Sequence, residues 1–489
     1  MPTTRRLTIL QVNDTHGYLA EHAELFRDGA GFRHETLGGY ARIKAYFDAV
    51  RAERGAGAVL ALDNGDTFHG TFPAVQTRGQ ALVEPVNRLG LDAWTVHWDA
   101  VWGPERMREI ADQLGHPLLA LNAHREGSGT PGSGERPYPG SVALERGGVR
   151  VGVVGLAATI IDDAFPERVS GDLRYSLGRG ELPAEIRRLR DEDGAELVVV
   201  VSHLGFPQDC QLAADVGGID VLLSGHTHNR TRRPATVGAT TVIQSGCHGS
   251  FVGRLDLEVD AGGTVQSVRH ALVPLDASVE PDAEMQGLVD AVYAPHRERL
   301  AEVVGRTETV LHRYATLEAP MDHVLLDAVA EAAGREVAFS NGWRYGAPVP
   351  PGDVTVNDLW NIIPTNPPVS VCELTGAEVW AMMEANLQST FARDPYEQKG
   401  GYVKRCRGLH VYAKLENPEG ERVQEVFVAG ERLDRDAVYD VAFVTEQGVP
   451  RTYGRDRRDL DVSAVDALRA HFRRHGTVRP GHRGTVVAA

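Results

Sequence analysis

Cysteine is scarce in this chain: its 489 residues include four, namely Cys210, Cys247, Cys372 and Cys406. They lie far apart and form no Cys-x-x-Cys pair, which argues against a disulfide framework and against a zinc–thiolate site. Long apolar runs are absent as well, since none approaches the roughly 18 residues that a membrane-spanning helix needs. We therefore expect a protein without a membrane partner.

An excess of positive charge is also missing. Lys and Arg number 51 against 67 Asp and Glu, which gives a formal net charge of -16. Such a chain does not bind nucleic-acid backbones through charge alone, so we expect no nucleic-acid polymer as a partner. A bound divalent ion reverses the field locally, which keeps small anionic substrates possible. The pair Arg5-Arg6 precedes an apolar run too short for a secretory signal, so we expect a cytoplasmic protein. Nothing in the sequence indicates an oligomeric state.

Four apolar runs that predict buried strands are each followed by Asp or His. The runs and the residues that follow them are 7–12 with Asp14 and His16, 58–62 with Asp66, 197–201 with His203, and 219–223 with His226 and His228. Taken singly, each polar residue has a structural explanation as a turn residue, a cap or a satisfied core histidine. Taken together, carboxylates and neutral imidazoles suit zinc, manganese or iron, and a carboxylate can bridge two ions. The set predicts a two-metal hydrolase.

Apolar strands alternate with amphipathic helices over the first half of the chain. We expect helices over 39–53 and 182–191 and strands over 149–156 and 197–201. This alternation predicts parallel strands joined by crossover helices. The Asp and His motifs then fall at the carboxyl ends of the strands, where open α/β sheets place their sites.

The pattern changes after residue 305. Residues 283–303 predict one long helix, and helices over 321–333 and 375–389 are followed by several strands. We therefore divide the chain into a metal-binding domain (residues 1–280), a linker helix (281–304) and an α+β substrate domain (305–489).

The ordered motifs Asp14-x-His16, Gly65-Asp66, His203 and Gly225-His226-Thr227-His228 resemble those of the calcineurin-like metallophosphoesterases. With the domain that follows, the chain resembles the bacterial 5′-nucleotidase family. The resemblance implies an α/β fold, namely a β-sandwich flanked by helices plus a smaller α+β substrate-binding domain. It also implies two divalent ions, manganese or zinc. Asp14, His16 and His228 would hold one ion, His203 and His226 the other, and Asp66 would bridge them.

The third motif of the family departs from its usual form. The chain reads Val96-His97-Trp98-Asp99 where relatives carry Gly-Asn-His followed by Glu or Asp. By the resemblance, His97 takes the place of an Asn ligand of the second ion, Trp98 that of the catalytic His, and Asp99 that of its carboxylate partner. Trp cannot take part in acid–base catalysis. Either the general acid comes from elsewhere, or the leaving group needs none, or His97 serves in an altered geometry.

The His-Trp-acid motif also resembles one branch of the family, the sulfate thiol esterases of bacterial thiosulfate oxidation. The segments 342–346 and 394–401 agree with that branch, while Asp99 stands where it has Glu. A thiolate leaves more readily than an alkoxide, which would make a missing proton donor tolerable.

In the second domain, Asn341 and Arg344 match the substrate loop of the nucleotidases, and a guanidinium suits an anionic oxygen. The aromatic residues that sandwich the base in nucleotidases are absent near 362–364 and 445–448. Trp343 and Tyr402 are candidates to replace them, although packing in the domain core explains both equally well.

These observations predict a metal-dependent phosphoric ester hydrolase. It would act on a nucleotide or a related small phosphoester through a metal-activated hydroxide, with His97, Asp99 and Arg344 as candidate catalytic residues. The first alternative is a sulfate thiol esterase. The second is a metal-bearing binding protein without catalytic activity.

Overall fold

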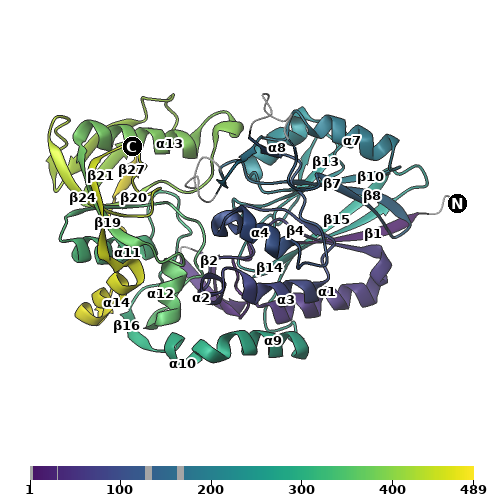
Figure 1. The fold of residues 1–489 in the computed structure, drawn as a ribbon, viewed down its shortest axis with the longest axis horizontal. Coiled ribbons are helices and arrows are strands. Elements are labelled where there is room, and N and C mark those ends of the chain that lie inside the picture. Colours follow the sequence, from purple (N-terminus) through teal and green to yellow (C-terminus); the bar gives the residue numbers. More distant parts are fainter. Residues whose placement is uncertain (1–3, 30, 127–134, 162–169) are drawn as a thin grey trace. The chain divides into compact units, whose positions relative to one another are not determined.

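The computed structural model describes residues 4–29, 31–126, 135–161 and 170–489 (Figure 1). The chain forms two compact units. Unit 1 comprises Met1–Glu24 and Glu35–Ala294, and unit 2 comprises Leu25–His34 and Pro295–Ala489. Unit 2 thus includes a short segment from near the N-terminus, which the sequence did not indicate. Within the described ranges, no helix combines the length and the apolar character that crossing a membrane requires.

The first sheet of unit 1 has five strands in the order β15-β14-β1-β4-β5. Strand β1 pairs in parallel with β4, and β4 pairs in parallel with β5, whereas β14 and β15 are antiparallel. The bounds of these strands are Arg5–Val12 (β1), Val59–Asp63 (β4), Ala93–Trp94 (β5), Phe251–Val259 (β14) and Val265–Pro274 (β15).

The second sheet of unit 1 has six strands in the order β12-β13-β11-β10-β8-β7. Its strands are Ala235–Val237 (β12), Thr240–Ile243 (β13), Val221–Ser224 (β11), Leu197–Ser202 (β10), Val149–Leu156 (β8) and Ser141–Arg146 (β7). The four central strands are parallel, but β12 and β7 are antiparallel edges. Both sheets are therefore mixed, and the expected parallel arrangement holds for β1, β4 and β5 of the first sheet and for the four central strands of the second.

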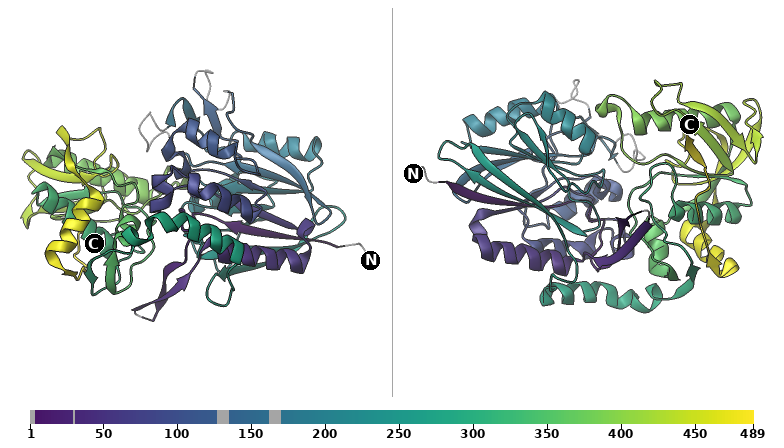
Figure 2. Two further views of the ribbon diagram at one scale, coloured as in Figure 1. Left: turned by 60° about the horizontal axis from the view of Figure 1, so that its bottom comes forward. Right: turned by 180° about the vertical axis from the view of Figure 1, so that it is seen from behind.

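The two sheets pack face to face, as the alternation of side chains along β1 shows. Leu7 and Ile9 belong to a buried cluster shared with residues of β8, β10 and β11. Leu10 and Val12 point to the opposite face, where they pack with α1 (Tyr40–Arg54) and α3 (Gln80–Leu89). Successive side chains of a strand point to opposite faces, so this one strand contributes to two core layers. Helices lie outside the paired sheets, as Figure 2 shows.

The other elements described within the first 280 residues are short helices, 3₁₀ turns and two two-stranded sheets. They are β2 (His22–Asp28), β3 (Gly31–Leu37), η1 (Ala56–Ala58), α2 (Phe72–Gln76), η2 (Trp98–Trp102), α4 (Pro104–Ala111), β6 (Ala123–Arg125), β9 (Leu173–Tyr175), α7 (Leu182–Asp191) and α8 (Phe206–Asp215).

The prediction of one helix over residues 283–303 is wrong. The segment forms α9 (Ala283–Tyr293), a 3₁₀ turn η3 (Ala294–His296) and α10 (Arg297–Leu300), and strand β16 begins at Val303. Pro295 lies at the break, because proline lacks the N–H that an α-helix needs and clashes with the preceding turn. Asp282 caps α9, since its side chain accepts the N–H of Met285 at 2.8 Å.

Unit 2 is built on a five-stranded mixed sheet, β20-β17-β24-β19-β25. Its strands are Arg405–Arg407 (β20), Val337–Ser340 (β17), Val438–Val444 (β24), Pro368–Thr375 (β19) and Arg455–Ser463 (β25). Two smaller sheets contain Glu431–Arg432 (β23), Val423–Val428 (β22), Leu409–Ala413 (β21) and Val486–Ala488 (β27), and Gly352–Thr355 (β18), Val303–Thr307 (β16) and Thr477–Val478 (β26).

The helices of unit 2 are α11 (Pro320–Ala333), α12 (Val356–Ile362), α13 (Gly376–Phe391), η4 (Pro395–Glu397) and α14 (Ala464–His475). Capping boxes fix where two of them begin. The side chain of Thr355 pairs with Asp358 at the start of α12, and Thr375 pairs with Glu378 at the start of α13. Each box satisfies backbone N–H groups that the first helical turn leaves free.

Candidate metal centre

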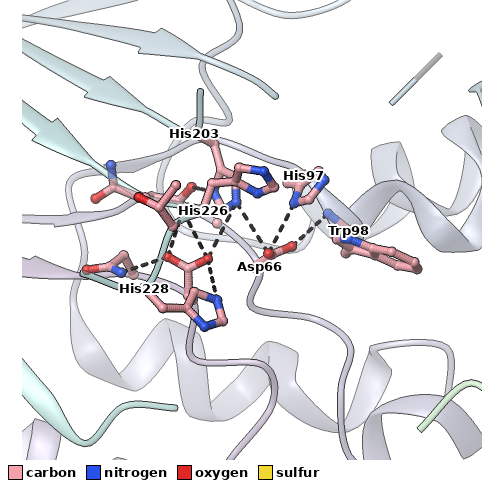
Figure 3. Close-up of polar contacts among 12 residues, drawn as sticks. Asp66, His97, Trp98, His203, His226 and His228 are labelled. Atoms are coloured by element: carbon pink, nitrogen blue, oxygen red, sulfur yellow. Dashed lines mark hydrogen bonds and ion pairs between the residues drawn. The ribbon is translucent and has the colours of Figure 1, made fainter. Parts of the chain in front are cut away.

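The Asp and His motifs lie just beyond the carboxyl ends of neighbouring strands in the two sheets. Asp14 follows β1 and Asp66 follows β4 in the first sheet, while His203 follows β10 and His226 follows β11 in the second. His97 follows the short edge strand β5. Because these ends lie at the same edge of the sandwich, residues up to 214 positions apart in the chain meet there (Figure 3).

The backbone around these residues is unusual. Left-handed conformations occur at Asp14 (φ 51°), His16 (φ 49°), Asp66 (φ 57°), His226 (φ 72°) and His228 (φ 57°). Residues other than glycine rarely adopt positive φ, and clusters of such strain mark functional sites. Gly65 allows one of these turns, since a Cβ there would lie 2.4 Å from the carbonyl oxygen of Thr95. The fold thus accepts local strain in order to direct these side chains inward.

One group of candidate ligands centres on Asp66. Oδ2 of Asp66 lies 3.1 Å from Nδ1 of His97 and 3.3 Å from Nε2 of His203. His226 completes the group, whose four buried residues bring their ligand atoms within 4.8 Å of one another. Figure 3 shows His97 and His203 directed at the Asp66 carboxylate.

A second group contains Asp14, His16 and His228. Nε2 of His228 lies 3.2 Å from Oδ1 of Asp14 and 3.0 Å from Nε2 of His16. The groups adjoin, because Nε2 of His203 lies 3.5 Å from Oδ1 of Asp14. All seven ligands predicted from the sequence are therefore brought into two adjacent groups, and His97 lies in the group of the second ion.

The chemistry of these groups fits divalent ions. Nδ1 of His203 lies 2.6 Å from the backbone carbonyl of Asn64 and donates to it, which makes Nε2 the nitrogen that faces the carboxylates of Asp14 and Asp66. Nε2 of His203 is buried and has no hydrogen-bond partner among the described residues. Metal-binding histidines commonly donate their second ring N–H to a carbonyl or carboxylate in this way. The buried carboxylate and imidazole groups are consistent with a dinuclear metal site.

The buried carboxylates and imidazoles of the site shift the pKa values of one another. Burial opposes protonation of His203, but the carboxylates of Asp66 and Asp14 outweigh it and raise its pKa to about 9. Burial lowers the pKa of His97 and takes that of His16 well below its ordinary value, despite the attraction of Asp66. Burial alone would raise the pKa of Asp66, yet His97 and His203 bring it well below the ordinary value. The carboxylate is thus ionised and ready to bind cations.

Two buried amides connect the loops of the site. The side chain of Asn64 donates to the carbonyls of Ser202 and Leu223 at 2.8 and 2.7 Å, which links the loop after β4 to β10 and β11. Gln11 donates to Oδ1 of Asn64 at 2.7 Å and to the carbonyl of Ser224 at 2.9 Å. Both amides are fully buried. They hold the ends of both sheets together beneath the ligands, and sequence analysis did not single them out.

Asp99 has a different environment from the one expected of a proton-transfer partner. Its Oδ1 accepts the backbone N–H groups of Thr67 and Phe68 at 2.8 and 2.7 Å, and its Oδ2 accepts those of Asp66 and His97 at 2.9 and 3.3 Å. The carboxylate therefore orders the loop that carries Asp66. This arrangement favours a positioning role over the catalytic role expected from the motif.

His69 is a residue of the site that sequence analysis missed. Its Nε2 lies 3.1 Å from Oδ1 of Asp66 and 3.2 Å from Nδ1 of His16, and its ring centroid lies 5.8 Å from that of Trp98. The backbone N–H of Trp98 also donates to Oδ1 of Asp66 at 2.7 Å. The only available signal was its position three residues after Asp66, on the loop of a motif already recognised.

A further buried group adjoins the centre but carries its own counter-charge. His22, Glu24 and His248 lie close enough to share an ion. However, Arg230 lies 2.6 Å from the buried carboxylate of Glu24, and Ser250 donates to the same carboxylate at 2.8 Å. The guanidinium neutralises Glu24, so this group is best explained as a buried ion pair that supports the site.

The four substrate residues predicted from the second domain all lie in unit 2. Asn341 follows β17 and is half-buried, as is Tyr402. The Arg344 guanidinium lies 6.0 Å from the centroid of the Tyr402 ring. Trp343 is 4% exposed, and the Arg313 guanidinium lies 5.5 Å from its ring centroid. The burial of Trp343 favours the packing explanation over base stacking.

Comparison with known proteins agrees with the fold. The profile described as "5'-nucleotidase, C-terminal domain" matches residues 303–445. The sulfate thiohydrolase SoxB of Thermus thermophilus superposes with a TM-score of 0.91 at 26% identity, over 100% of this chain and 97% of that one. A 5'-nucleotidase precursor, also from Thermus thermophilus, superposes with a TM-score of 0.84 at 23% identity, over 99% of both chains, and supports the fold.

The chain is thus similar to proteins of the 5'-nucleotidase family along almost its whole length. The family model covers only the C-terminal part of the chain, while the structural likeness extends over both units. Among curated proteins, the trifunctional nucleotide phosphoesterase YfkN of Bacillus subtilis is 25% identical over 478 residues. That match covers 88% of this chain and 30% of the Bacillus protein. The expected fold, a two-domain α/β protein with sheets flanked by helices, is confirmed.

Proposed function

We propose that this protein is a dinuclear-metal hydrolase of nucleotides or related small phosphoesters. The observation that carries the proposal is the pair of buried ligand groups that meet between Asp14 and Asp66. Manganese and zinc both suit this set of carboxylates and imidazoles. Two divalent ions held there would stabilise charge on the phosphoryl oxygens and lower the pKa of a bound water.

The chain's own residues would organise this chemistry. Asp66 would help to hold the ions, while the backbone N–H of Trp98 and the ring of His69 contact its Oδ1 and orient the carboxylate. Asn64 would fix the ring of His203 through the 2.6 Å contact to its backbone carbonyl. In unit 2, we propose Asn341, Arg344 and Tyr402 as substrate contacts, with the Arg344 guanidinium binding an anionic oxygen.

A second candidate function is sulfate thiol ester hydrolysis. Trp98 favours it, because the indole cannot donate a proton to a leaving alkoxide, whereas a thiolate leaves without one. The likeness to the Thermus sulfate thiohydrolase at a TM-score of 0.91 also supports it. The same ligand groups would serve, since the sulfonyl oxygens of an S-sulfonated thiol are anionic like those of a phosphoryl group. A metal-bearing binding protein without turnover is the third possibility.

A matched panel of substrates tests these functions. The manganese-loaded protein is given nucleoside monophosphates, cyclic nucleotides, nucleotide sugars, an aryl phosphate and an S-sulfonated thiol, and released phosphate and sulfate are measured. Phosphate from the nucleotides supports the leading proposal. Sulfate from the thiol without phosphate supports the second candidate.

The control for contaminating hydrolases is Asp66→Asn, which removes the carboxylate between the ligand groups. We expect this variant to lose bound metal and any activity seen on the panel. A variant that keeps two ions and the full rate would contradict the proposed ligand set. No product from the wild type with both ions bound would support a binding protein.

A further inference from the structure

A separate set of metal-ligating side chains lies in unit 2, on neighbouring helices α11 and α14 (Figure 1). Glu331 lies in the last turn of α11, and His471 and His475 lie four residues apart in α14. Residues four apart share one face of an α-helix, so both imidazoles face the same neighbour. None of the three belongs to the motifs of the candidate metal centre in unit 1.

The carboxylate of Glu331 lies between the two imidazoles. Oε2 lies 3.0 Å from Nδ1 of His471, and Oε1 lies 2.8 Å from Nε2 of His475. The ring centroids of the two histidines are 4.5 Å apart. One ligand atom from each residue can be chosen so that all three lie within 4.8 Å of one another.

These separations are close to those around a tetrahedral zinc ion. Metal–nitrogen and metal–oxygen distances of about 2.0–2.2 Å place ligand atoms about 3.3 Å apart in a tetrahedron. Two imidazoles and one carboxylate are a common zinc ligand set, with the fourth position left to water. Small rotations of the side chains are enough to direct the three atoms at one point.

The position also allows an ion to enter. The side chain of His471 is 6% exposed, while those of Glu331 and His475 are 27% and 43% exposed. Arg474 is the competing charge, with its guanidinium 3.3 Å from Oε2 of Glu331. Its side chain is 64% exposed, and ion pairs this exposed contribute little, so Arg474 can turn into solvent when an ion binds.

We propose that Glu331, His471 and His475 form a second, separate metal site that binds Zn²⁺ and joins α11 to α14. The ion would link the two helices, because its ligands come from two helices that pack side by side within unit 2. The spacing of the two histidines places two ligands on the same face of α14, and the carboxylate of Glu331 on α11 supplies the third.

Zinc titration of the full chain by isothermal calorimetry tests the proposal, using His475→Gln and Glu331→Gln. We expect wild type to bind one more equivalent of zinc than either variant. His475 is exposed, so its replacement is expected to leave the fold intact, which circular dichroism checks. The metal centre of unit 1 is unchanged in all three proteins, so its ions cancel in the comparison, whatever their number.

The matched control is Arg474→Gln, which removes the competing guanidinium and keeps all three ligands. It should bind the extra equivalent at least as tightly as wild type. Zinc should also raise the unfolding temperature of wild type more than that of His475→Gln. Equal zinc stoichiometry in wild type and both ligand variants would overturn the proposal.

Discussion

Oδ2 of Asp99 accepts the backbone N–H of Asp66 at 2.9 Å. The carboxylate that the motif placed in proton transfer therefore holds the loop of the central metal ligand. Four backbone N–H groups converge on Asp99, and an amide in its place would turn an NH₂ group toward some of them.

We expect Asp99→Asn to lower the free energy of unfolding by about 1–3 kcal/mol, the usual cost of leaving buried polar groups unsatisfied. It should also weaken metal binding, because the Asp66 loop loses its anchor. Urea unfolding and metal titration measure both effects, with exposed Asp112→Asn as the control. If stability and metal affinity are unchanged and only the rate at saturating metal falls, Asp99 acts in catalysis and the positioning role is wrong.

His69 should influence the metal centre without being one of the ligands predicted from the motifs. Its Nε2 lies within 3.2 Å of both Asp66 and His16. Outer partners of metal ligands typically contribute about 10–100-fold to metal affinity or activity. We expect His69→Phe to lose metal affinity in this range. Calorimetric metal titration of the variant, compared with exposed His34→Gln, makes the measurement. Unchanged affinity would show that His69 only fills space.

Trp98 stands where, by the resemblance, the family motif carries a catalytic His, and its replacement separates the candidate functions. Under the phosphoesterase proposal, Trp98→His should raise the rate on nucleoside monophosphates at least tenfold, since general acids contribute about 10²–10⁴-fold. Aryl phosphates should gain less, because a phenolate leaves without a proton. The ratio of the two initial rates is the measurement. Trp98→Phe is the matched control. Equal rates for the His and Phe variants would show that the reaction gains nothing from a general acid at position 98.

Lys404 gives unit 2 a pH dependence of its own. Burial lowers its pKa from 10.5 to about 7, while its Nζ donates to the carbonyls of Gln447 and Gly448 at 2.6 and 2.9 Å. Between pH 7 and 10.5 the unfolded chain binds more protons than the folded one, so this residue makes stability rise with pH. The slope is at most about 1.4 kcal/mol per pH unit.

Lys404→Met should remove that slope. Urea unfolding at pH 7 and pH 9 would show the wild type gaining stability relative to the variant as the pH rises. Lys414→Met, at an exposed position, controls for the loss of a lysine elsewhere. A constant difference between wild type and Lys404→Met at both pH values would mean that Lys404 stays charged in the folded protein.

Much of the site follows from the sequence because its ligands are tied to strand ends. An apolar run such as 197–201 is typical of a buried parallel strand, and His203, two residues after it, then lies where that strand ends. Parallel pairing brings such ends together whatever their separation in the chain. The recurrence of Asp and His after four such runs was therefore enough to predict where the ligands meet.

Other features were decided by tertiary contacts that leave no local pattern. Asp99 could be assigned to the loop of Asp66 only when the backbone N–H groups around it were placed, since the motif itself fits either role. His69 joined the site because a strained turn at Asp66 brings it back to His16. The site on α11 and α14 depends on contact between two helices whose residues Glu331 and His471 are 140 positions apart in the sequence. Strand periodicity and motif order are local patterns that can be recognised in the sequence. These contacts, in contrast, arise only when distant segments pack together.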